Sequence, residues 1–103
     1  ITAFVAMNDM LAYGVIDAVR GAGFSVPADY SVCGFDNIFP SGFAGVGLTT
    51  VEHYMRDKGR NALEILHEKI RGLAFRRNIT RVEYGHKLIV RGSTAAPRRA
   101  SAF

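Results

Sequence analysis

Short apolar runs and amphipathic stretches follow one another along the first third of the chain. Residues 3–7 and 30–35 are apolar, contain β-branched residues, and are typical of buried strands. Residues 10–22 between them carry apolar positions at helical spacing. The predicted apolar face of this helix consists of Leu11, Val15, Ala18, Val19 and Ala22. A strand, a helix and a strand in this order predict a βαβ unit with a parallel sheet.

The remaining two thirds predict a loop, a strand, a longer helix and two further strands. Residues 36–47 are rich in glycine and long for a loop, and residues 48–52 read as a strand. A helix is expected over residues 54–71, and strands over 79–84 and 87–92. The predicted apolar face of the longer helix consists of Met55, Ala62, Leu63, Leu66 and Ile70.

Composition places the chain among globular proteins. Of its 103 residues 49% are hydrophobic and 21% are charged, which excludes a disordered or low-complexity segment. It has no apolar run of about 18 residues that would span a membrane. Cys33 is the single cysteine, so an internal disulfide is excluded. The chain opens at Ile1 within an apolar run, and we therefore expect it to be a piece of a longer polypeptide.

The net charge of +4 is unevenly distributed. Residues 1–55 carry a net charge of −4, and residues 56–103 carry +8. Such an asymmetry raises the question of a nucleic-acid partner. Most of the basic residues lie on or beside the predicted helix over 54–71 or in the tail, and no aromatic residues interleave with them as in single-strand binders. A solvated helix face is therefore the favoured interpretation of the positive half.

The order of short motifs over residues 2–97 resembles the C-terminal part of LacI/GalR-family transcriptional regulators. Each motif is weak alone, and the series in order is specific. The motifs are Asn8-Asp9, Ala12-Tyr13-Gly14, Gly23 to Asp29, Ser31 to Asn37, Leu48 to Val51, Gly59-Arg60, and Leu88 to Thr94.

The resemblance implies an α/β fragment of a two-lobed, periplasmic-binding-protein-like (type I) fold, with a parallel sheet flanked by helices. Residues 1–51 would belong to the C-terminal effector-binding lobe. Residues 52–87 would supply a helix and a strand that pack on the N-terminal lobe, and residues 88–97 a returning crossover strand. Residues 98–103 would form a tail. The family's DNA-binding helix-turn-helix is absent from this sequence.

Three side chains are predicted to bind the effector, which in this family sits between the lobes. Asn8 and Asp36 follow the predicted strands, and open α/β sheets bind ligands at the carboxyl ends of their strands. A carboxylate accepts hydrogen bonds from hydroxyls, and a carboxamide both donates and accepts, which suits a sugar or a nucleobase edge. His53, at the expected hinge, is the third. The alternatives are a helix cap for Asn8, a turn former for Asp36 and a half-exposed junction residue for His53.

The helix over 10–22 and the loop after residue 37 resemble dimer-contact segments of the family. The predicted contact residues are Tyr13, Gly14, Asp17, Arg20, Phe39 and Phe43. Exposed aromatic residues in a glycine-rich loop suit an interface. The alternative is that both phenylalanines fold back on their own lobe.

Other reactive side chains are given structural interpretations. Asp9 is predicted to cap the first helix, and Cys33 to be a buried, unreactive thiol. His67 and His86 lack metal-ligand spacing, and no nucleophile motif is present, so we expect neither a metal, a cofactor nor an enzyme.

The sequence therefore predicts the effector-binding and dimerisation part of a cytoplasmic LacI-type regulator. Operator DNA would be bound only through the missing N-terminal domain, and no membrane partner is expected. The alternatives are a part of a periplasmic sugar-transport protein and a small α/β enzyme domain. Val46-Gly47 stands where family members often carry Pro-Pro, which leaves the identity of the effector open.

Overall fold

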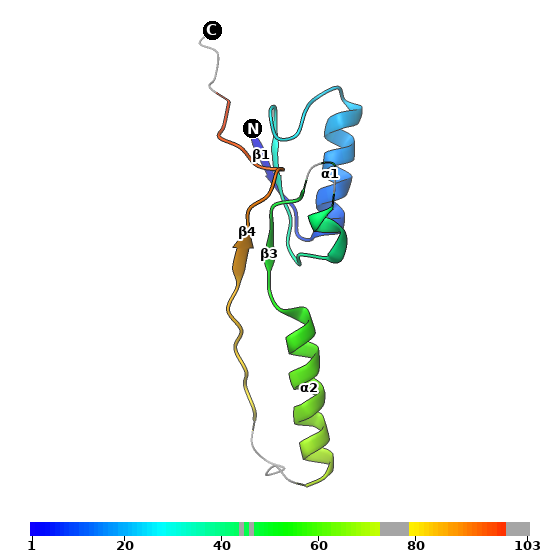
Figure 1. Cartoon of the computed structure of the whole chain (residues 1–103), viewed down its shortest axis with the longest axis vertical. Coiled ribbons are helices and arrows are strands. Elements are labelled where there is room, and N and C mark those ends of the chain that lie inside the picture. The colour runs from blue at the N-terminus through cyan, green and yellow to red at the C-terminus, as the bar shows by residue number, and fades with distance from the viewer. Residues whose placement is uncertain (44, 46, 73–78, 99–103) are drawn as a thin grey trace. The chain divides into compact units, whose positions relative to one another are not determined.

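The computed structural model describes residues 1–43, 45, 47–72 and 79–98, and within these the chain divides into two compact units (Figure 1). The first comprises residues 1–52 together with the segment from residue 87 onward. The second comprises residues 53–86. These boundaries lie close to the predicted 52–87 segment. Which lobe of a larger protein each unit would join stays a prediction.

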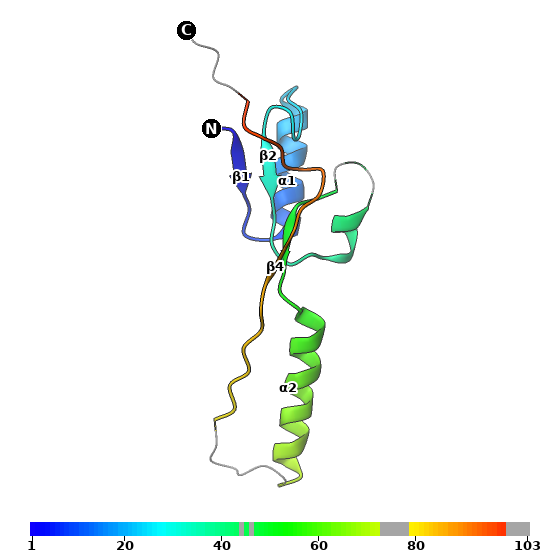
Figure 2. The ribbon, with the colours of Figure 1, turned by 60° about the vertical axis from the view of Figure 1, so that its left-hand side comes forward.

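The first unit is built on a parallel strand pair covered by a helix (Figures 1 and 2). Strand β1 (Ala3–Val5) pairs in parallel with β2 (Ser31–Cys33), and helix α1 (Asp9–Gly21) connects them. This confirms the predicted βαβ unit. A parallel bridge from Cys33 to Thr49 continues the sheet toward the next segment.

The segment from residue 87 onward completes the first unit. Strand β3 (Thr50–Glu52) pairs antiparallel with β4 (Lys87–Ile89), and a short 3₁₀ helix, η1 (Phe39–Gly42), precedes β3. Beyond β4, Ser93 is fully buried and joins two strands: its hydroxyl donates to the Val32 carbonyl (2.6 Å) and accepts from the Thr49 amide (2.7 Å).

The core of the first unit lies between α1 and the strands. It consists of Ala12, Ile16, Val32 and Leu48. The predicted apolar face is confirmed in part: Val19 is buried and Val15 packs against the core, whereas Leu11, Ala18 and Ala22 are exposed. The buried stripe runs instead through Ala12, Ile16 and Val19. The two stripes are adjacent on the helix and both are apolar, so periodicity alone did not distinguish them.

The second unit is a single helix with an extended segment beside it. Helix α2 (Met55–Ile70) confirms the helix predicted over 54–71. Asn61 Nδ2 donates to the Tyr84 hydroxyl (2.5 Å), which fixes the extended segment to the helix. The strand predicted over 79–84 is wrong, since residues 79–86 form no ladder in the described chain. A strand needs a pairing partner, and no described residue supplies one to this segment.

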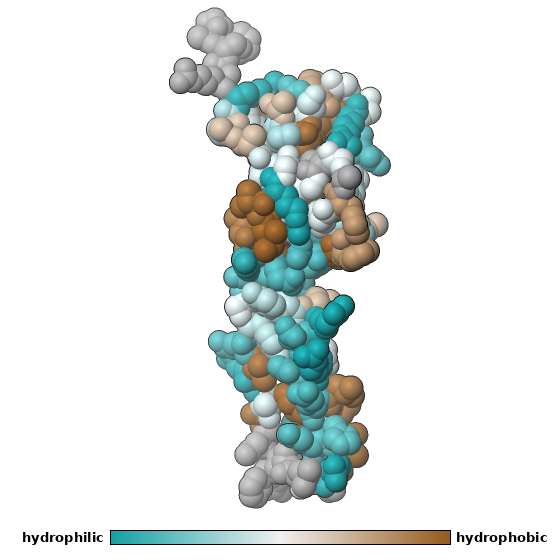
Figure 3. All heavy atoms as spheres, in the orientation of Figure 1, coloured by the Kyte–Doolittle hydropathy of each residue, from teal (hydrophilic) through white to brown (hydrophobic). Residues whose placement is uncertain are grey.

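The apolar face of α2 is uncovered. None of the described residues of this helix is buried, and Leu63, Leu66 and Ile70 are all more than half exposed. Hydrophobic surface accordingly remains visible over α2 (Figure 3). Helix α2 is amphipathic, but its own unit supplies nothing among the described residues to bury that face.

Candidate functional site

Two of the predicted ligand residues lie at the same edge of the parallel strand pair. Asn8 follows β1 and Asp36 follows β2, and the Asp9 amide donates to the Phe35 carbonyl (2.8 Å) between them. Parallel strands present their carboxyl ends at one edge, where open α/β sheets bind ligands. The backbone therefore places a carboxamide and a carboxylate on neighbouring segments.

Asn8 combines the capping role with a remaining hydrogen-bonding group. Its Oδ1 accepts from the Leu11 amide (2.8 Å), so Asn8 is the N-cap of α1. Asp9 was expected in that role, and that expectation is wrong. The side chain also carries a carboxamide nitrogen, which is a hydrogen-bond donor. Its predicted contact with a ligand stays a prediction.

Asp36 sits in a turn whose backbone is held in an uncommon conformation. Both Asp36 (φ 114°) and Asn37 (φ 50°) have positive φ. Asparagine adopts the left-handed region near 50° readily, whereas the φ of Asp36 is rare for a residue other than glycine. The Asp36 amide donates to the Val51 carbonyl (3.0 Å). Asn37 is fixed on both sides, because Oδ1 accepts from Arg91 (2.7 Å) and Nδ2 donates to Glu52 (2.8 Å).

His53 lies in the second unit. It is buried, and its Nδ1 accepts a hydrogen bond from Lys58 Nζ (3.0 Å) in the first turns of α2. The lysine nitrogen lies 5.7 Å from the centre of the Tyr84 ring. The structure therefore gives His53 a partner within its own unit, and within the first unit it brings Asn8 and Asp36 to one edge.

The predicted dimer residues gather around a groove between α1 and η1. This groove has a volume of about 490 Å³, and Tyr13, Asp17, Arg20 and Phe43 line it. Gly14 and Phe39 do not line it, and a Cβ at Gly14 would meet nothing within 4 Å beyond the adjacent part of its own helix in the described chain.

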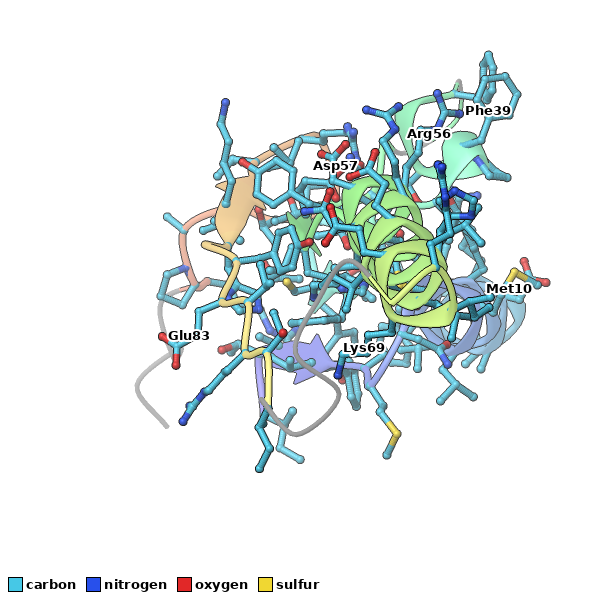
Figure 4. The ribbon with its side chains drawn as sticks, turned by 90° about the horizontal axis from the view of Figure 1, so that it is seen from below. Met10, Phe39, Arg56, Asp57, Lys69 and Glu83 are labelled. Carbon is cyan, nitrogen blue, oxygen red and sulfur yellow. The ribbon has the colours of Figure 1, made fainter. Side chains whose placement is uncertain are left out.

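Two aromatic side chains stand out from η1 and the residue after it. Phe39 is 85% exposed and projects outward, as does Met10 of α1 (Figure 4). The Phe39 ring contacts the Phe43 ring edge to face, and the ring centres are 4.8 Å apart. Phe39 therefore does not fold back on the described part of its unit, whereas Phe43 is 57% exposed and lines the groove beside α1. Contact of either ring with a second copy stays a prediction.

The residue that sequence reasoning missed is Asp9. Its side chain is fully buried and accepts hydrogen bonds from the Ser41 hydroxyl (2.5 Å), the Thr50 hydroxyl (2.5 Å) and the Ile38 amide (3.0 Å). One signal was present in the sequence: Asp9 lies on the stripe of Ala12 and Ile16, at i+3 and i+7.

Other chemistry is sparse in the described chain. Burial first, and the negative charge of Asp9 second, raise the pKa of the Cys33 thiol, which keeps it protonated at neutral pH. Among the described residues, no group of three or more His, Cys, Asp and Glu side chains could hold a metal ion. No helix in the described part of the chain is long and apolar enough to cross a membrane.

Parallel strands with a covering helix and polar side chains at their carboxyl edge are the arrangement in which open α/β sheets bind ligands. The chain belongs to the periplasmic binding protein-like domain family, whose profile matches residues 2–94. This confirms the fold class expected from the sequence.

Regulators of transcription are among its relatives. The chain is 36% identical over 92 residues to the transcriptional repressor PurR of Mannheimia succiniciproducens, covering 89% of this chain and 27% of that protein. It is 39% identical over 93 residues to the arabinose metabolism transcriptional repressor of Geobacillus stearothermophilus, covering 90% of this chain and 25% of that protein. The chain thus spans about a quarter of the length of these curated relatives.

Solved structures of LacI-family regulators share the fold. A LacI-family regulator from Enterococcus faecium with bound ribose matches with a TM-score of 0.80 and 31% identity, covering 95% of this chain and 36% of that one. A lac repressor dimer bound to operator matches with a TM-score of 0.74 and 29% identity, covering 92% of this chain and 32% of that one. The resemblance to the effector-binding core of LacI/GalR-family regulators is therefore confirmed.

Proposed function

We propose that this chain is the effector-binding and dimerisation part of a LacI-type transcriptional repressor that senses a small, sugar-like ligand. The placement of Asn8 and Asp36 at one carboxyl edge of the β1–β2 pair carries the proposal. The repressors among its relatives favour a regulator over a periplasmic transport protein. A repressor of this kind is not an enzyme and acts in the cytoplasm, where it meets DNA through a domain outside this sequence.

The ligand chemistry follows from the two side chains. Asp36 would accept hydrogen bonds from two adjacent hydroxyls of a sugar, while the Asn8 carboxamide nitrogen would donate to a ring or hydroxyl oxygen. His53, the third residue predicted to bind the effector, would supply a further hydrogen bond. Closure of two lobes on a sugar would then shift the subunit between states of different operator affinity.

The first test removes the Asp36 carboxylate from the longer polypeptide. Wild-type protein is titrated by calorimetry with D-ribose, L-arabinose, cellobiose, adenine and guanine, and the tightest ligand is carried forward. Asp36→Ala is expected to weaken its binding at least 100-fold, because two charge-assisted hydrogen bonds are lost. Asp29→Ala removes a carboxylate whose partners, Ser25 and Arg98, lie elsewhere, and is the matched control. Equal affinity of Asp36→Ala and wild type would show that the site is misplaced.

The second part of the proposal concerns the groove between α1 and η1, which we assign to a second copy of the chain. Its aromatic and apolar lining beside Asp17 and Arg20 gives one surface both an apolar centre and charged edges, as in protein interfaces. The solved lac repressor dimer is consistent with this occupant. Tyr13, Asp17, Arg20, Phe39 and Phe43 would form the contact.

Replacement of Phe43 tests whether the groove binds a second copy of the chain. Phe43→Ser in the longer polypeptide is expected to raise the dimer dissociation constant at least tenfold, since a half-exposed aromatic ring would lose its partner surface. Sedimentation equilibrium measures the constant. Phe24→Ser changes another half-exposed phenylalanine that does not line the groove, and it should leave the constant unchanged. A Phe43→Ser dimer as stable as the wild-type dimer would exclude this face.

A further inference from the structure

The Asp9 carboxylate is a buried charge that the proposed contacts do not use. It is fully buried, and its three hydrogen-bond donors are two hydroxyls and one backbone amide. A buried carboxylate is costly unless directed donors satisfy it. Gly34 leaves room for it, since a Cβ at this position would collide with the Asp9 side chain. Such a packed, fully bonded group holds its donors in fixed positions.

Two of these donors belong to the turn that carries Asp36 and to the strand beside it. The Ile38 amide donates directly to Asp9 Oδ2 (3.0 Å). The Thr50 hydroxyl donates to Asp9 Oδ1 and accepts from the Asn37 amide (3.3 Å). The backbone on both sides of Asn37 is thus tied to Asp9, in the same turn where Asp36 and Asn37 adopt positive φ. Asp9 therefore helps to hold the turn in which Asp36 has a φ of 114°, which is rare for a residue other than glycine.

The third donor belongs to the segment that borders the groove. Ser41 lies in η1, between Phe39 and Phe43, and donates to the same carboxylate oxygen as Ile38. The Leu48 amide donates to the Ser41 carbonyl (3.0 Å), so both the side chain and the backbone of this residue are anchored. One side chain, that of Asp9, thus connects the Asp36 turn with the aromatic segment.

We propose that Asp9 is a positioning residue that orients Asp36 for the effector and, through Ser41, fixes η1 at the subunit groove. The inference rests on the proposed function and adds a residue to it. Asp9 touches neither ligand nor partner subunit. It acts through Thr50 and Ile38 toward the effector edge, and through Ser41 toward the groove. Different hydrogen bonds make these two connections, so each connection can be removed by its own substitution.

The test uses the longer polypeptide and the tightest sugar or nucleobase of the panel above. Asp9→Asn keeps the shape but replaces one acceptor oxygen by a donor, and it is expected to weaken ligand binding about tenfold or more. Thr50→Val should weaken ligand binding while leaving the dimer dissociation constant within about twofold of wild type. Ser41→Ala should raise that constant about fivefold and change ligand binding less. Thr50→Ser retains the hydroxyl and should restore wild-type binding. Asp29→Asn is the matched control.

The combined results for these variants distinguish a positioning role of Asp9 from a purely stabilising role. If Thr50→Val and Ser41→Ala lower both affinities in proportion to their melting temperatures, the role of Asp9 is structural only and the inference is overturned. Wild-type affinity of Asp9→Asn overturns it as well. Should Asp9→Asn fail to fold, the Thr50 and Ser41 variants decide alone. Loss of binding in Asp36→Ala with no effect of the Thr50 and Asp9 variants would retain the proposed function and reject this inference.

Discussion

The two units of the chain use similar amphipathic helices in opposite circumstances. Helix α1 packs Ala12 and Ile16 against Val32 of β2 and Leu48 before β3, and its N-terminal Asp9 is enclosed by three donors. Helix α2 has an equally regular apolar face, but no described residue of it is buried. Amphipathic spacing therefore predicts a helix in both cases, while only a covering partner makes the apolar face a core.

The two units also differ in the polar contacts that they contain. In the first unit hydroxyl, carboxylate and backbone groups from distant segments meet in buried hydrogen bonds, as at Asp9 and Ser93. In the second unit Asp57 and Arg60 form an exposed ion pair at 3.8 Å. Exposed pairs of this kind contribute little, whereas buried polar networks fix one arrangement of the chain. We expect the first unit to hold the geometry of the site.

The largest effect is expected in the core of the first unit. Ile16 is 3% exposed, and Ile16→Ala should lower the free energy of unfolding by about 3 kcal/mol through lost burial and the cavity left behind. Leu11 is 54% exposed on the stripe predicted from periodicity, and Leu11→Ala should cost less than about 0.5 kcal/mol. Urea unfolding of the longer polypeptide, followed by circular dichroism, measures both. If Leu11→Ala lowers the free energy of unfolding as much as Ile16→Ala does, the face predicted from periodicity is part of the core as well.

A smaller effect on stability is expected in the second unit, and its size depends on whether the longer polypeptide is present. Leu66 is 55% exposed, so Leu66→Ala should leave the helicity of the 103-residue segment nearly unchanged. In the longer polypeptide it should cost about 2 kcal/mol, because residues 52–87 are predicted to pack on the N-terminal lobe. Glu68→Ala, on the polar side of the same helix, is the control. An unchanged stability of the longer polypeptide would mean that α2 stays uncovered there.

Much of the fold was predictable from local pattern. The apolar runs at 3–7 and 30–35 with a helix between them predicted a parallel pair, and β1 and β2 form it. The helix predicted over 54–71 is present as α2. The strand expected over 79–84 failed because strand formation depends on a neighbour, which apolar alternation within one segment does not supply.

The candidate site was predictable in part. Asn8 and Asp36 were chosen because both follow parallel strands, and the structure places them at one edge. Asp9 was misassigned as the helix cap because the two neighbouring residues cap equally well in sequence terms. What separates them is contact with Ser41 and Thr50, which lie 32 and 41 residues further along the chain.

The sequence by itself determined the two helices and the β1–β2 pair, because local spacing of apolar residues and caps acts over a few residues. It also determined the family, through motifs in a fixed order. Only the tertiary structure decided which stripe of α1 is buried and where Asp9 directs its charge. The reason is that Gly34, Ser41 and Thr50, which surround Asp9, lie far from it in the sequence and meet it only in the folded unit, where Asp9 shares one stripe of α1 with the core residues Ala12 and Ile16.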